Sequence, residues 1–128
     1  MKFTLLFIML FCHIVDDYYL QGWLASAKKK SWWEKNSPEK MYSKDYIMAL
    51  CEHAFSWTFM IMLPPMIYSY CNSTFSFAVY GSCFFLNWVI HSVVDNLKAN
   101  VKAINLIQDQ AIHFAQILMT WTIFISMK

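Results

Sequence analysis

The sequence predicts an all-α polytopic membrane protein, with four transmembrane helices in a bundle and an amphipathic interfacial segment before the fourth. Of its 128 residues, 59% are hydrophobic and 14% are charged, whereas about a quarter of a typical soluble domain is charged. Apolar runs near the roughly 20 residues that cross a bilayer recur along the chain. Histidine and aspartate punctuate these runs, and ionisable groups at membrane depth indicate a functional site. We expect one domain, residues 1–128.

The first span is expected over residues 3–24. His13, Asp17 and Gln21 repeat every four residues, so they share one face of an α-helix. Asp16 falls off this polar stripe and is expected at the membrane interface. Because charged residues interrupt the apolar run before any cleavage point, we expect a retained helix rather than a signal peptide.

Residues 25–45 are hydrophilic and are expected to rest on anionic lipid headgroups. Lysines beside tryptophans are typical of such an interface, and the segment contains Lys28, Lys29, Lys30, Trp32 and Trp33. A solvated loop without a specific ligand is the alternative.

The second span is expected over residues 46–63, with His53 inside it. Pro64 and Pro65 follow, and we expect the helix to stop there because proline removes a backbone donor. Residues 66–73 then form a short connection at the opposite interface.

The third span, residues 74–97, carries a polar stripe of its own. Asn87, His91 and Asp95 lie four residues apart, so they too share a helix face.

Residues 98–108 have Val101, Ile104 and Ile107 at helical spacing, which predicts a short helix lying in the interface. The fourth span, residues 109–127, has Asp109 and His113 near its start.

The lysine distribution predicts the orientation. Eight of the ten lysines fall in the first and third connections, and positive residues favour the cytoplasmic side. We therefore expect loops one and three in the cytoplasm and both termini outside. Each histidine then lies in the cytoplasmic half of the membrane.

Histidines and carboxylates that converge from facing helices can bind a metal ion. The expected metal ligands are His13, His53, His91, His113, Asp17, Asp95 and Asp109. Six of them form three His–Asp pairs with four-residue spacing: His13 with Asp17, His91 with Asp95, and Asp109 with His113. Asp17, Asp95 and Asp109 are also the candidate catalytic residues, as the general base. The expected cofactor is a divalent metal, with zinc favoured, although manganese or iron accept the same ligands. One ion or two fit the spacing equally well.

A hydrogen-bonded network without any ion is the competing interpretation, since polar residues in membrane bundles often bond only to one another. A proton relay through the same residues is a third interpretation.

The motifs HIVDDYYLQ, NWVIHSVVDNLK and DQAIH, together with the lone His53, resemble the small phage and bacterial membrane proteins of domain of unknown function thirty-three-oh-seven. The resemblance covers nearly the whole chain. It implies a bacterial (host cell) inner-membrane location, and it supplies no activity.

The expected function is a metal-dependent hydrolase acting on a lipid or headgroup-linked substrate. The alternative is a non-enzymatic phage or host envelope-modifying membrane protein, or a proton relay. The expected partners are membrane lipids, with no nucleic acid, because all ten basic residues are lysine and specific readers of nucleic acid usually depend on arginine. The sequence is also compatible with a homo-oligomer.

Overall fold

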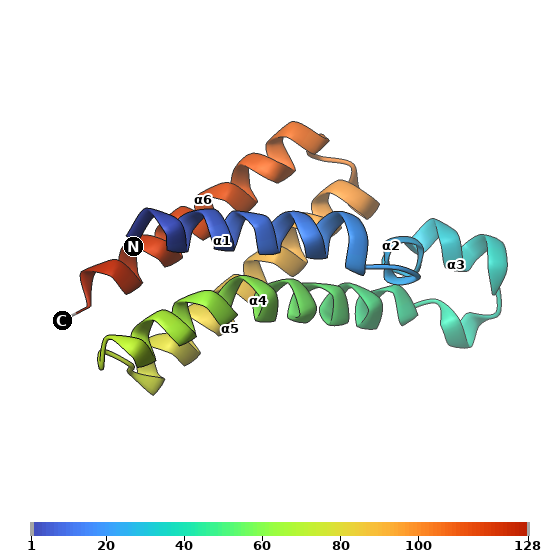
Figure 1. The fold of residues 1–128 in the computed structure, drawn as a ribbon. Coiled ribbons are helices and arrows are strands. Elements are labelled where there is room, and N and C mark those ends of the chain that lie inside the picture. Colours follow the sequence, from blue (N-terminus) through green and yellow to red (C-terminus); the bar gives the residue numbers. More distant parts are fainter. Residues whose placement is uncertain (1, 128) are drawn as a thin grey trace.

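Four long helices lie side by side in a computed structural model that describes residues 2–127 (Figure 1). They are α1 (Lys2–Ile14), α4 (Asp45–Cys71), α5 (Phe77–Asn96) and α6 (Leu106–Ser126). Helix α4 packs against α1 and α5, and α6 contacts all three of the others. Every regular element of residues 2–127 is helical, so the all-α prediction is confirmed.

Three helical stretches are long and apolar enough to cross a membrane: Lys2–Leu20, Lys40–Cys71 and Phe77–Val101. Helix α6 is not among them, although it has 21 residues. Its Gln108, Asp109, Gln110, His113 and Gln116 lower its mean hydropathy.

Helix α1 continues into a π-helical segment, η1 (Val15–Leu20). A π-helix bonds residue i to residue i+5, so successive side chains are separated by a smaller angle than in an α-helix. Asp16 and Asp17 both point inward as a result, and both are buried. The interfacial position predicted for Asp16 is therefore wrong. The chain leaves the helix at Gly22, whose φ of 48° suits a residue without a side chain.

Helix α4 does not stop at the two prolines. It runs through Pro64 and Pro65 to Cys71, so the predicted end at residue 63 is wrong. Membrane helices tolerate proline where neighbouring groups satisfy the freed backbone. At 1.5 Å per residue, the 27 residues of α4 span about 40 Å.

The first connection folds into helices α2 (Leu24–Ala27) and α3 (Lys30–Asn36) and a short 3-10 turn, η2 (Lys40–Tyr42). The Trp23, Trp32 and Trp33 rings pack edge to face, with centroids 5.0–6.0 Å apart. Asn100 Nδ2 donates to Lys28 O (3.0 Å). These contacts turn the Lys28 side chain into the bundle, where it is 5% exposed. Lys28 therefore does not rest on headgroups as predicted.

The interfacial helix predicted over residues 98–108 is not formed. A π-helical segment, η3 (Leu97–Val101), extends α5, and Lys102 then takes a left-handed conformation with φ 58°. Asn105 begins α6 with a capping box in which it and Gln108 satisfy each other's backbone N–H groups. The fourth helix therefore starts three residues earlier than predicted.

The interior has two unlike halves. An apolar core of Leu5, Met9, Trp57, Ile61, Met62, Cys83, Ile117 and Phe124 fills the half that contains the two chain ends. The half next to α2 contains buried histidine and aspartate. Large apolar side chains such as Phe7 and Ile107 are 69% and 80% exposed on the outside. Polar groups inside and apolar groups outside are expected of a bundle in a lipid environment.

Candidate metal centre

Six buried side chains from η1, α4, α5 and α6 meet in the polar half of the bundle. They form three overlapping groups whose ligand atoms lie within 4.8 Å of one another: Asp17–His53–His91, His91–Asp95–His113 and Asp17–Asp109–His113. We call these six residues the His/Asp centre. Of the seven predicted metal ligands, the structure brings six together, and His13 is the exception.

The polar atoms of the centre are too far apart for strong hydrogen bonds. His53 Nε2 lies 3.4 Å from Asp17 Oδ1 and 3.3 Å from Asp95 Oδ2. His113 Nε2 lies 3.5 Å from Asp95 Oδ1 and 3.4 Å from Asp109 Oδ1. Hydrogen bonds between such atoms are usually about 2.7–3.2 Å long. Two ligands about 2.1 Å from one ion, at a tetrahedral angle, are about 3.4 Å apart. The spacing therefore suits ligands around a cation.

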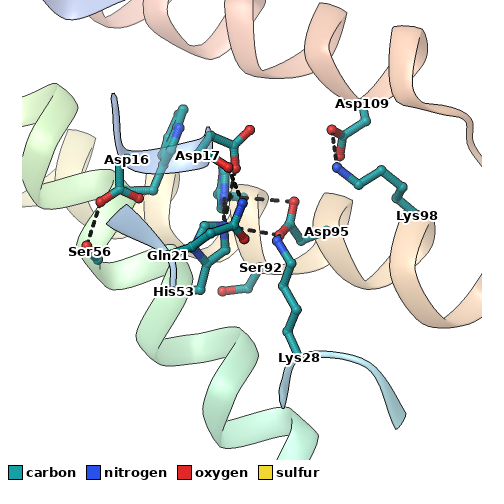
Figure 2. Close-up of polar contacts among 12 residues, drawn as sticks. Asp16, Asp17, Gln21, Lys28, His53, Ser56, Ser92, Asp95, Lys98 and Asp109 are labelled. Atoms are coloured by element: carbon teal, nitrogen blue, oxygen red, sulfur yellow. Dashed lines mark hydrogen bonds and ion pairs between the residues drawn. The ribbon is translucent and has the colours of Figure 1, made fainter. Parts of the chain in front are cut away.

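Each aspartate is fixed through its outer oxygen. Lys28 Nζ donates to Asp95 Oδ2 and Lys98 Nζ to Asp109 Oδ2, both at 2.6 Å (Figure 2). Gln110 Nε2 donates to Asp17 Oδ2 (3.0 Å) and Asp109 Oδ2 (3.0 Å). The Oδ1 atoms of all three aspartates are left facing the histidines. These contacts orient Asp95 Oδ1 and Asp109 Oδ1 toward His113, and Asp17 Oδ1 toward His53.

A chain of amides sets the protonation of His113. Gln116 Nε2 donates to Asn87 O (3.1 Å) and Asn87 Oδ1 (3.2 Å), so Gln116 Oε1 is the atom that faces His113 Nδ1 at 3.1 Å. His113 Nδ1 must then carry a proton, because an amide oxygen only accepts. Neutral His113 consequently directs the lone pair of Nε2 at Asp95 Oδ1 and Asp109 Oδ1.

Those three atoms have no hydrogen-bond partner within residues 2–127. Three acceptors that face one another in a buried site are unfavourable unless a cation or an added proton lies between them. The centre could therefore hold a positive species at this position.

His13 occupies a different position from the one predicted. Its Nδ1 accepts from Trp57 Nε1 (2.7 Å), and its Nε2 lies 3.0 Å from Gln110 Oε1. Both ring nitrogens are therefore engaged, and neither has a lone pair free for an ion. The expected pairing of His13 with Asp17 is replaced by a bridge through Gln110, which orients Asp17 and Asp109.

The charges of the polar half do not balance through lysine alone. Lys28 pairs with Asp95, and Lys98 pairs with Asp109. No ammonium group in the described part of the chain forms an ion pair with Asp16 or Asp17; Asp16 Oδ1 accepts from Ser56 Oγ (2.6 Å), as Figure 2 shows. Two buried carboxylates thus lack a cation, and one divalent ion would supply the missing charge.

Lys28 and Lys98, which hold two aspartates of the centre, were not among the predicted site residues. Lys28 lies in a lysine-rich loop, and only the fold turns it inward, whereas Lys98 follows Asp95 on the same helical stretch but bonds to Asp109. Gln110 and Gln116 of α6 orient the inner residues: Gln110 donates to Asp17, and Gln116 Oε1 faces His113 Nδ1.

The family model described as "Protein of unknown function (DUF3307)" matches residues 5–128 of the chain. No curated protein and no solved structure matches the chain.

Proposed function

The chain belongs to the DUF3307 family, and we propose that it is a membrane protein that binds a divalent metal ion at the His/Asp centre and uses the ion in hydrolysis. The observation that carries the proposal is the set of three acceptors formed by His113 Nε2, Asp95 Oδ1 and Asp109 Oδ1. An ion among them would replace the hydration that these atoms lost on burial.

The ligand chemistry favours zinc. Imidazole nitrogen with carboxylate oxygen suits zinc, and a catalytic zinc site combines three protein ligands with an open position. His91, Asp95 and His113 form one such group, with Asp17 and Asp109 close by. The cluster is large enough for manganese or iron, or for two ions that share carboxylates.

Asp17 is the best-placed general base. It is the one carboxylate of the His/Asp centre that also lines a small surface pocket. In hydrolysis, a water oxygen forms a bond to the substrate's ester centre, and Asp17 takes the water proton. The bond to the leaving oxygen breaks, and that oxygen receives the proton. His91, Asp95 and His113 would hold a divalent ion beside this water, and such an ion would supply Lewis-acid chemistry by lowering the pKa of the water and stabilising the developing negative charge.

A proton relay is the second candidate. His53 Nε2 lies 3.3 Å from His91 Nε2 and 3.3 Å from Asp95 Oδ2, and Asp95 Oδ1 lies 3.5 Å from His113 Nε2. Asp95 would therefore pass a proton between His53 and His113. Two protonated histidines would balance the same excess negative charge as one divalent ion.

The membrane placement that we propose keeps four spans, with α6 as the fourth. Its polar face packs inward on the His/Asp centre, while Leu118 and Met119 are exposed on the outer face. Loops one and three would face the cytoplasm and both termini the other side, following the lysines.

Chelation separates the two candidates. The detergent-purified protein, dialysed against a strong chelator, should unfold at a lower temperature than before, and added zinc should restore the original value, because an ion bound only to the folded state stabilises it. His91→Ala should abolish this response. If neither the chelator nor zinc changes the unfolding temperature of the wild-type protein, the proton relay is supported instead.

A further inference from the structure

A small polar pocket opens beside the His/Asp centre. Its cavity volume is about 150 Å³, and Asp17, Gln21, Lys28, Lys98 and Gln110 are among its lining residues. Because Asp17 both lines the pocket and belongs to the His/Asp centre, the pocket reaches one of the proposed metal ligands. A molecule in the pocket would therefore meet the ion.

The pocket is suited to an anion. Each lysine ammonium has three N–H donors, and within residues 2–127 each uses one of them on an aspartate. Figure 2 shows the two lysines reaching their aspartates from different segments, Lys28 from the turn after α2 and Lys98 from η3. The remaining donors of the two lysines border this cavity, which Asp17 also lines. Gln110 only lines it, because both N–H groups of its amide are used on Asp17 and Asp109. A tetrahedral phosphoryl group and one water molecule fit such a space.

An apolar groove continues from the pocket along the outside of the bundle. The groove has a cavity volume of about 410 Å³ and is lined by Ile14, Tyr18, Tyr19, Gln110 and Phe114. Tyr18 and Gln110 line the pocket as well, so the two cavities adjoin. Tyr19 is 77% exposed, and the groove therefore faces the surroundings of the helices rather than the interior.

We infer that this combined site binds a lipid phosphate, with the phosphoryl group between Lys28 and Lys98 and the hydrocarbon chain in the groove. The inference rests on the proposed function, since the pocket would present the phosphate ester to the ion at the His/Asp centre. Hydrolysis would then form a bond from water oxygen to phosphorus and break the bond from phosphorus to the lipid oxygen, which takes the proton that Asp17 received. A free phosphate would use the pocket but not the groove.

Titration calorimetry of the zinc-loaded protein in a neutral detergent tests the inference with three probes: farnesyl phosphate, farnesol and inorganic phosphate. We expect farnesyl phosphate to bind at least about tenfold more tightly than either of the others, because farnesol lacks the charged hydrogen bonds of the phosphate and inorganic phosphate lacks the apolar contacts of the chain. Equal binding of farnesyl phosphate and farnesol would overturn the phosphate assignment. Equal binding of farnesyl phosphate and inorganic phosphate would overturn the lipid assignment.

Two pairs of variants locate the site. Lys98→Gln should weaken farnesyl phosphate binding about tenfold, whereas Lys102→Gln, an exposed lysine outside the pocket, should not. Ile14→Ser should weaken farnesyl phosphate binding but not phosphate binding, and Ile90→Ser is its control, since the two isoleucines are 43% and 41% exposed. Equal effects within either pair would contradict the assigned position.

The metal content of each sample is measured alongside, so that the two claims fail separately. A protein that contains metal but does not prefer farnesyl phosphate would overturn the lipid phosphate site and leave the metal centre supported. A preference for farnesyl phosphate in a protein without metal contradicts the proposed function and supports the pocket.

Discussion

Single residues outside the His/Asp centre decide how its atoms point. Gln116 fixes the tautomer of His113, Gln110 holds the outer oxygens of Asp17 and Asp109, and Lys28 holds that of Asp95. Such outer partners orient ligands and tune their basicity. The residues that surround the ligands therefore offer sharper tests than the ligands alone.

Removal of Gln116 should weaken the metal site without destroying it. Gln116→Leu frees His113 to adopt the other tautomer, and the loss of such an outer partner typically lowers metal affinity about 10–100-fold. His113→Gln should abolish stoichiometric binding. Competition with a chromophoric chelator measures both affinities, with Thr122→Val, an exposed position on the same helix, as the control. An unchanged affinity in Gln116→Leu would mean that this amide does not set the tautomer.

Lys28 should contribute far more to stability than the lysine beside it. Lys28→Met leaves Asp95 buried without its ammonium partner, and breaking a buried ion pair costs about 3–5 kcal/mol. Lys29 is exposed, so Lys29→Met should change the free energy of unfolding by less than about 0.5 kcal/mol. Denaturant unfolding in detergent compares the two, and similar small effects would argue against a buried Lys28.

At the scale of elements, the four-residue repeats predicted which faces are polar but not which residues meet. The repeats assume α-helical geometry, and η1 departs from it, so Asp16 was misplaced and Asp17 faces His53 rather than His13. Lys28 could not be found from the sequence, because its position depends on the folding of the first connection against α5.

The N-cap of α6 at Asn105 lies in the segment where an interfacial helix was predicted, and its contribution to stability can be measured. Asn105→Ala removes the side chain that accepts from Gln108 N (3.0 Å), and the loss of an N-cap costs about 1 kcal/mol. Asn72→Ala is a suitable control, because the Asn72 side chain is exposed and bonds only within its own helix. Equal stability of the two variants would contradict the capping box.

Asp109 lies only one turn after Asn105, so fraying at this end should also reach the centre. We expect Asn105→Ala to lower metal affinity, whereas Asn72→Ala should not change it.

At the scale of the molecule, composition predicted the helical class, and the positions of the polar residues predicted six of the residues that meet in the centre. The end of α4 was predicted wrongly at its two prolines, because the cost of a proline in a helix depends on neighbouring groups that a sequence does not show. The apolar exterior and polar interior remain the main structural support for a membrane location.

The proposed topology places the two ends of the bundle on opposite sides of the membrane. In a cysteine-free background, Lys30→Cys and Lys102→Cys should react with a membrane-impermeant thiol reagent only after the cytoplasmic face is opened, and Ser126→Cys should react from outside. Labelling of all three from one side would contradict four spans.

The most direct test of the account is the metal content of the purified protein. Protein isolated in mild detergent without added metal or chelator is analysed by mass spectrometry of the elements, together with His113→Gln and Thr122→Val. We expect about one or two equivalents of a divalent transition metal per chain in the wild type and in Thr122→Val, and a substoichiometric amount in His113→Gln. Wild-type protein that carries no such metal, and that takes up none on addition of zinc, manganese or iron, would contradict it.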